Sequence, residues 1–265
     1  MLYSYKWLQE YIKATLPKPE KLADLLNMHA FEVEDIRKKG SDTLLDIAVL
    51  PNRAHDCLNH VGMAREIAAI AKLKFLPPKA RAITVRKGTR AAIKVHIQSS
   101  EAVPRYTALL IEGIKLTKSP KWLVDRLQAL GVNSINNVVD LTNVIMRELG
   151  QPLHAFDYDQ IKGNEMTIRE ARAGEKLETL DGNTLSLPKG VLVIEDSKRL
   201  IDLAGIKGGK MSAISERTKN IVLQAANFNA ESIYRAKSQL NYTSQAAHLY
   251  SHEIDPNLTI SALER

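Results

Sequence analysis

The sequence has little cysteine and no long hydrophobic run. Cys57 is the single cysteine among 265 residues, so no internal disulfide can form and a reducing compartment is expected. No apolar run approaches the roughly 18 residues that a membrane helix needs. The first ten residues lack the apolar segment of a secretory signal. We therefore expect a cytoplasmic protein with no membrane partner.

Several familiar catalytic motifs are also missing. The sequence has no Gly-x-Gly-x-x-Gly or Walker-type loop and no Gly-x-Ser-x-Gly motif, which argues against a nucleotide-binding loop and a serine hydrolase. The histidines are scattered, and only His248 and His252 have a metal-ligand spacing. With no acidic or cysteine cluster beside them, a surface helix is favoured and no metal site is expected. The remaining composition, 45% hydrophobic and 25% charged, is that of a globular protein.

The net charge of +7 is concentrated in one stretch. Between Glu66 and Glu101 there is no acidic residue but there are eight basic ones: Lys72, Lys74, Lys79, Arg81, Arg86, Lys87, Arg90 and Lys94. One interpretation is a solvated interdomain linker, which the Pro77-Pro78 pair favours. The other is a strap that contacts nucleic-acid phosphates. We predict nucleic-acid binding by Lys79, Arg81, Arg86, Lys87 and Arg90.

The order of periodic segments predicts an α+β protein. A small α+β module over 1–75 is expected to contain two helices, two strands and a long helix capped by Asp56, followed by a basic linker over 76–90. A larger mixed-sheet α/β module is expected over 91–265, because its strands and helices do not alternate strictly. Its expected strands lie at 92–97, 105–111, 165–171, 176–180, 191–195, 200–204 and 220–226, and its expected helices start at Ser119-Pro120, carry Val138 to Leu149, and cover about 230–239 and 244–252.

The segment from Asn136 to Asp157 is the most unusual in the chain. Its helical pattern places Thr142 and Asn143 beside an apolar stripe, and Gly150-Gln-Pro then turns the chain so that His154 leaves the helix. Further along come the glycine pair Gly208-Gly209, Gln224 on a strand and Ser244 at a helix start. These residues predict either one polar cleft or a satisfied polar network at a helix–loop corner.

Long motifs in this sequence resemble the β subunit of bacterial phenylalanyl-tRNA synthetase. The similar segments are 51–57 (PNRAHDC), 62–66 (GMARE), 137–143 (NVVDLTN), 148–157 (ELGQPLHAFD), 171–182 (ARAGEKLETLDG), 203–209 (LAGIKGG) and 254–256 (IDP). They follow the family's order and cover essentially the whole chain. The resemblance implies the family's first small module followed by its B3/B4 editing module.

The resemblance implies that the larger module hydrolyses tyrosine mischarged onto tRNA(Phe). A synthetic site that accepts a phenyl ring rejects one added hydroxyl only weakly, by roughly a hundredfold, so a second site is useful. Carried over by position, the catalytic residues are His154, Asn143 and Thr142, which would hold the aminoacyl ester and a water. The substrate-binding residues are Gly208, Gly209, Gln224 and Ser244, where the backbone N–H groups of the glycine pair and the side chain at 224 would read the phenol.

The sequence departs from the family at several points. Gln224 stands where the family usually has Glu, and Ser244-Gln-Ala-Ala247 replaces a motif with an acid at its second position. A neutral amide can still bond a phenol, but charge-assisted bonds are about twice as strong. The tight turn over Lys38–Ser41 stands where many members insert an oligonucleotide-binding barrel. A non-catalytic, tRNA-docking portion of the synthetase with a degraded pocket therefore remains an alternative, as does a free-standing amino-acid- or RNA-binding protein.

The resemblance also implies partners. The chain would be a fragment of a longer β subunit, or a natural short form, that acts with tRNA(Phe) and with the synthetase α subunit in an α2β2 heterotetramer. No cofactor is expected in this region, whereas the complete synthetase uses ATP and Mg²⁺ at the α subunit.

Overall fold

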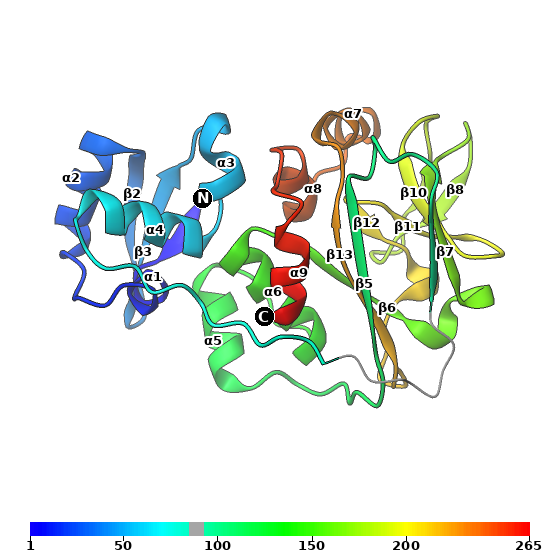
Figure 1. Cartoon of the computed structure of the whole chain (residues 1–265), viewed down its shortest axis with the longest axis horizontal. Helices are drawn as coiled ribbons and strands as arrows, with labels where there is room; N and C mark the ends of the chain where they lie inside the picture. The colour runs from blue at the N-terminus through cyan, green and yellow to red at the C-terminus, as the bar shows by residue number, and fades with distance from the viewer. Residues whose placement is uncertain (85–92) are drawn as a thin grey trace. The chain divides into compact units, whose positions relative to one another are not determined.

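The computed structural model describes residues 1–84 and 93–265, which form two compact units. The first unit contains Met1–Arg81, Lys118–Gln151 and Arg265, and the second contains Ala82–Thr117 and Pro152–Glu264. The first unit combines helices with a three-stranded sheet and the second combines helices with several sheets, which confirms the predicted α+β class (Figure 1).

The first unit is built on a three-stranded antiparallel sheet in the order β1-β3-β2. Ser4 caps the first helix by accepting a hydrogen bond from the Trp7 N–H at 3.0 Å. Pro19 occupies the first turn of the second helix, where its missing N–H costs nothing. The elements of this unit are β1 (Leu2–Ser4), α1 (Tyr5–Glu10), α2 (Pro19–His29), β2 (Glu32–Lys39), β3 (Asp42–Ala48), α3 (Pro51–Cys57), α4 (His60–Ile70), α5 (Lys121–Ala129) and α6 (Asn137–Leu149).

The helix predicted to follow Asp56 is α4, but its predicted cap is wrong, because Asp56 lies within α3 and Asn59 caps α4. Asn59 is extended, with φ −159° and ψ 160°, and its side chain caps α4 by accepting from the Gly62 N–H at 2.7 Å. The chain is so crowded here that a Cβ on Gly62 would lie 1.6 Å from the Asp56 carbonyl oxygen. The break between α3 and α4 therefore depends on glycine at position 62.

Helices α5 and α6 pack into the core of the first unit. Leu123, Leu127 and Val144 belong to the same buried cluster as Trp7 and Leu45. These helices were expected within the 91–265 module, so the packing units differ from the predicted limits 1–75, 76–90 and 91–265. Those limits stay a prediction.

The second unit contains a five-stranded sheet, a three-stranded sheet and a two-stranded hairpin. In the five-stranded sheet, β12-β11-β10-β7-β4, β4 pairs parallel with β7 while the other pairs are antiparallel, as the mixed-sheet prediction requires. The three-stranded sheet, β5-β13-β6, is antiparallel (Figure 1). The elements are β4 (Lys94–Ile97), β5 (Arg105–Ile111), β6 (Leu153–Asp157), β7 (Glu165–Glu170), β8 (Lys176–Glu178), β9 (Thr184–Ser186), β10 (Leu192–Glu195), β11 (Leu200–Leu203), β12 (Lys207–Gly208), β13 (Ile221–Asn227), α7 (Ala230–Leu240), α8 (Gln245–Tyr250) and α9 (Leu258–Glu264).

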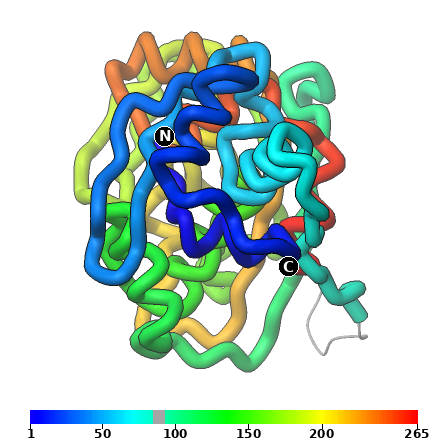
Figure 2. Tube along the Cα trace, turned by 90° about the vertical axis from the view of Figure 1, so that its left-hand side faces the viewer, coloured from blue at the N-terminus to red at the C-terminus, as the bar shows by residue number. Residues whose placement is uncertain are grey.

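The predicted basic strap is described only in part. Arg86, Lys87 and Arg90 lie outside the described residues, and Lys79 and Arg81 are exposed. The C-terminal residue lies beside this segment, where Arg265 Nη1 donates to the Lys79 carbonyl oxygen at 3.4 Å (Figure 2). Within residues 1–84 and 93–265, no helix has the length and apolar character needed to span a membrane.

Candidate functional site

A small pocket lined by both polar and apolar residues lies within the second unit. Its volume of about 70 Å³ exceeds the roughly 10–15 Å³ that one water molecule needs. It is formed by the starts of β6 and α8, the middle of β13 and the β11–β12 turn. The lining residues are Pro152, Leu153, His154, Asp202, Leu203, Gly205, Ile206, Lys207, Gly208, Gln224, Ala246 and Tyr250.

The end of α6 delivers His154 to this pocket. Gly150 terminates the helix in the left-handed region, with φ 81°, as the Gly-Gln-Pro motif predicted, and the chain then continues into β6. His154 then pairs directly with Gln224 on β13. Directly opposed residues on antiparallel strands place their side chains on the same face of the sheet. The predicted catalytic imidazole and the predicted phenol-binding amide are therefore neighbours.

The imidazole of His154 is neutral at physiological pH. Burial lowers its pKa from 6.5 to about 4, because the charged form loses its hydration. Its Nε2 atom is buried and has no hydrogen-bond partner among the described residues. The ring packs edge-on against Phe156, with centroids 4.5 Å apart. A buried nitrogen without a protein partner beside a water-sized space is suited to hold a water or a ligand atom.

The two glycines differ in their surroundings. A Cβ on Gly208 would lie 2.6 Å from His154 Cε1 and 2.7 Å from Leu180 Cδ1, so the pocket depends on the absence of a side chain there. Gly209 does not line the pocket, and its N–H already donates to the Ile201 carbonyl oxygen at 3.1 Å. The Gly209 N–H is therefore not a free donor in this structure, and the binding role predicted for that residue stays a prediction.

Gln224 and Ser244 have intramolecular partners. The Tyr106 hydroxyl donates to Gln224 Oε1 at 2.9 Å, and Gln224 is only 3% exposed. The Ser244 hydroxyl accepts from the Ala247 N–H at 3.0 Å, which caps α8, and donates to the Ile206 carbonyl oxygen at 2.8 Å. Ser244 thus links α8 to the turn that lines the pocket. Its predicted contact with substrate stays a prediction.

Thr142 and Asn143 belong to the other unit. Both lie on α6, and the Thr142 hydroxyl donates to the Val139 carbonyl oxygen at 2.7 Å. The residues that line the pocket all come from the second unit. The structure therefore brings together His154, Gly208 and Gln224, whereas the catalytic roles of Thr142 and Asn143 stay predictions.

Asp202 is a pocket residue that the sequence analysis missed. It lies on β11 and is 4% exposed. Burial raises the pKa of its carboxyl well above 3.8, because the carboxylate would lose its hydration. The signal was present in the sequence, since Asp202 interrupts the apolar run Leu200–Leu203 of a buried strand. Buried unpaired carboxyls are rare in such runs and gather at functional sites.

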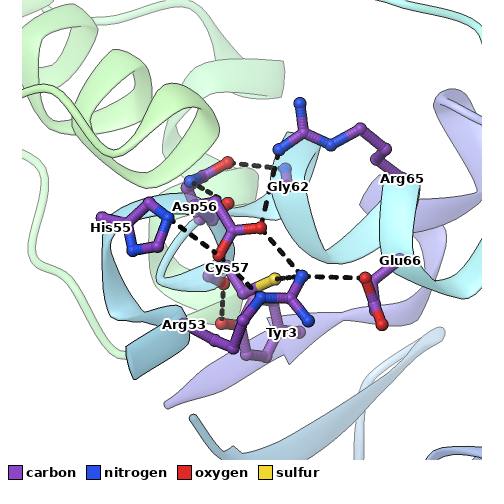
Figure 3. A network of polar contacts seen from close by, with 9 residues as sticks. Tyr3, Arg53, His55, Asp56, Cys57, Gly62, Arg65 and Glu66 are labelled. Atoms are coloured by element: carbon purple, nitrogen blue, oxygen red, sulfur yellow. Dashed lines mark hydrogen bonds and ion pairs between the residues drawn. The ribbon is translucent and has the colours of Figure 1, made fainter. Parts of the chain in front are cut away.

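The first unit contains a second cluster of polar groups, around Arg53 (Figure 3). Its guanidinium binds the carboxylates of Asp56 and Glu66, each at 2.8 Å, and so links α3 to α4. Burial raises the pKa of the Cys57 thiol to about 12, which leaves it unreactive. We interpret this cluster as structural. Within the described part of the chain, no group of histidine, cysteine and acidic residues could hold a metal ion.

Comparison with known proteins shows where the chain belongs. A family model described as the B3/4 domain matches residues 102–265. The phenylalanine–tRNA ligase beta subunit of Geobacter metallireducens is 42% identical over 226 residues, which are 84% of this chain and 28% of that protein. The corresponding subunit of Rhodopirellula baltica is 37% identical over 256 residues, 97% of this chain and 37% of that protein. The chain thus spans 28% and 37% of the lengths of these relatives.

Among solved structures, the chain is similar to an N-terminal fragment of the phenylalanyl-tRNA synthetase beta subunit from Pyrococcus horikoshii. The TM-score is 0.45 at 14% identity, over 95% of this chain and 73% of that one. The relatives and the family model confirm the resemblance recognised in the sequence motifs. The chain belongs to the B3/4 domain family.

Proposed function

We propose that this chain is part of the β subunit of a phenylalanine–tRNA ligase, and that the second-unit pocket hydrolyses tyrosine esterified to tRNA(Phe). The observation that carries the proposal is the direct pairing of His154 with Gln224, next to a glycine whose missing side chain leaves room at the imidazole. This pairing supports a site in which His154 contacts the ester and the neighbouring Gln224 hydrogen-bonds the side chain of the bound amino acid.

The chemistry required of the protein is modest. Water attacks the ester carbonyl, the bond to the ribose oxygen breaks, and tyrosine and free tRNA leave. An ester is already activated toward hydrolysis. Holding the water in line with the ester carbonyl can therefore supply much of the increase in the rate of hydrolysis. The neutral imidazole of His154, with an unpartnered Nε2, is suited to hold that water. Thr142 and Asn143 are proposed to assist, as the family resemblance implies.

The proposal extends to the complete ligase. We propose that tRNA(Phe) and the α subunit are its partners and that ATP and Mg²⁺ act at the α subunit. We propose no cofactor for this chain itself. The exposed Lys79 and Arg81 support a phosphate contact by the basic segment. Arg86, Lys87 and Arg90 are proposed to share that contact on the sequence pattern alone.

A second candidate function is a non-catalytic, tRNA-docking portion with a degraded pocket. Two contacts favour it: Tyr106 already occupies Gln224 Oε1, and Ser244 acts as a helix cap. In that case the Gln224→Glu variant would release tyrosine while the natural sequence would not. The two candidates therefore differ in the activity of the unmodified chain.

The experiment measures release of tyrosine from Tyr-tRNA(Phe) at high protein concentration, with Phe-tRNA(Phe) as the comparison substrate. We expect selective release of tyrosine, and its loss in His154→Ala. The matched control is His96→Ala, because His96 is an exposed histidine on β4 that does not line the pocket. No release by the natural chain, together with release by Gln224→Glu, would replace editing by the second candidate function.

A further inference from the structure

The Asp202 carboxyl is buried and lines the pocket. Among the described residues, no hydrogen bond or ion pair joins its side chain to another residue of the pocket. The pocket's lysine does not neutralise it, since Lys207 Nζ pairs instead with Asp181 at 3.4 Å. A buried carboxyl in the same pocket as the unpartnered Nε2 of His154 can hydrogen-bond a polar group of a ligand.

The register of the strands places this carboxyl at the phenol-reading end of the site. Asp202 pairs directly with Gly208, so its side chain lies on the face where a side chain at 208 would meet His154. Burial raises the pKa of the Tyr106 phenol and the nearby Asp202 carboxyl adds to that rise, so the two side chains are close to one another; Tyr106 in turn donates to Gln224. Asp202, Gly208 and Gln224 therefore surround one space.

We propose that Asp202 supplies the carboxyl that hydrogen-bonds the para-hydroxyl of a bound tyrosyl group, and so determines the preference for tyrosine over phenylalanine. This inference rests on the proposed editing function. It accounts for a site that has an amide at position 224, because the acid is supplied from β11 on the facing side of the pocket. A site built to hydrogen-bond a hydroxyl disfavours the analogue that lacks it, since the buried carboxyl is then left unpaired.

The test uses the full chain and two non-hydrolysable ligands, the 3′-amide-linked tyrosyl and phenylalanyl derivatives of adenosine. We expect the natural chain to bind the tyrosyl ligand more tightly. Asp202→Ala is expected to reduce that preference about tenfold, the loss of one hydrogen bond to a carboxyl. Asp202→Asn retains an acceptor of the same size and is expected to preserve most of the preference. Equal weakening of both ligands would overturn the proposal, because Asp202 would then act on the part they share.

Stability gives an independent reading, with Asp196 as the matched control. Asp196 is a buried aspartate that accepts backbone hydrogen bonds from Lys162, Lys198 and Arg199. Asp196→Asn should lower the midpoint of thermal unfolding and leave the ligand preference intact. Asp202→Asn should raise the midpoint, because it replaces a buried acid, whose charged form is disfavoured there, with a neutral amide of the same size. A lowered midpoint for Asp202→Asn would assign Asp202 a structural role and overturn the proposal.

The failures of the two proposals are distinguishable. If the natural chain binds the tyrosyl ligand selectively but releases no tyrosine from tRNA, the proposed editing activity is wrong. The role of Asp202 is then decided by the ligand preference of its variants. If tyrosine is released selectively and Asp202→Ala retains the full preference, editing stands and the inference about Asp202 is wrong. If neither ligand is preferred, the inference is overturned whatever the hydrolysis assay shows.

Discussion

The buried histidine of the first unit makes folding sensitive to mild acid. His60 has no exposed surface, and its ring stacks on Trp7 with centroids 4.0 Å apart. Nε2 accepts from the Ser4 N–H at 3.1 Å, so the proton of the neutral ring sits on Nδ1, which faces the Arg147 carbonyl oxygen at 2.9 Å. A second proton would have to go on Nε2, where it would point at another N–H donor.

The size of the effect follows from the pKa of His60 in the two states. Burial lowers the pKa in the native state to about 3, whereas an unfolded histidine titrates near 6.5. A lowered native pKa contributes stability that is present above pH 6.5 and is lost as the pH falls toward 3. Between pH 7 and pH 5 the unfolded histidine gains about 0.7 of a proton, whereas the native histidine gains almost none. The loss attributable to His60 is about 2 kcal/mol.

Urea unfolding of the natural chain and of His60→Gln, at pH 7 and pH 5, measures this loss. Trp7 and Trp122, the two tryptophans of the chain, both lie in the first unit, so fluorescence reports on that unit. The variant is expected to be less stable at pH 7 but to lose about 2 kcal/mol less on acidification. Other titrating groups are common to both proteins and cancel in the comparison. Equal losses in the two proteins would refute the assignment of acid sensitivity to His60.

Three further predictions concern single side chains. In Gly208→Ala the new methyl group would clash with His154, which should lower the free energy of unfolding by about 1–3 kcal/mol and abolish binding of the tyrosyl ligand. Unchanged binding would contradict the close contact between position 208 and His154. Ser244→Ala should cost about 1 kcal/mol in urea unfolding, because α8 loses its cap, and a neutral result would mean that water replaces the hydroxyl. Cys57 should resist a thiol reagent at pH 8 until the chain unfolds, since its thiol is buried with a pKa of about 12; rapid labelling of the native chain would contradict that burial.

The sequence predicted the regular parts of the fold well, for physical reasons that are local. Ser4 and Pro19 were recognised as helix starts, and Gly150 as a helix stop, because capping depends on one or two residues. The cap of the helix after Asp56 was predicted wrongly, because Asp56 lies within α3 and the side chain of Asn59 instead accepts from the Gly62 N–H at the start of α4. β6 was not predicted as a strand, because its residues alternate only weakly and its pairing with β13 is a long-range contact.

The candidate site could be predicted only in part. The motif around His154 and the strand position of Gln224 led to the same pocket, since their pairing follows from one sheet. Asp202 was missed because periodicity treats an aspartate in a strand as an exception, whereas its significance depends on what surrounds it. The packing of α5 and α6 in the first unit also lay beyond sequence patterns, which give the apolar face of a helix but not its partner.

The first unit is built from separate segments of the chain, so its parts are synthesised at different times. A ribosome completes residues 1–81 early, but Leu123, Leu127 and Val144 of the same core follow only after the whole of 82–117 has been made. Until then the nascent first unit exposes the apolar surface that those three side chains will cover. Its folding cannot be completed before these contacts, which are distant in sequence, have formed. Its last ion pair, between Arg265 and the buried Glu148, can close only when translation of residue 265 is complete. The first unit to emerge is therefore among the last to be finished.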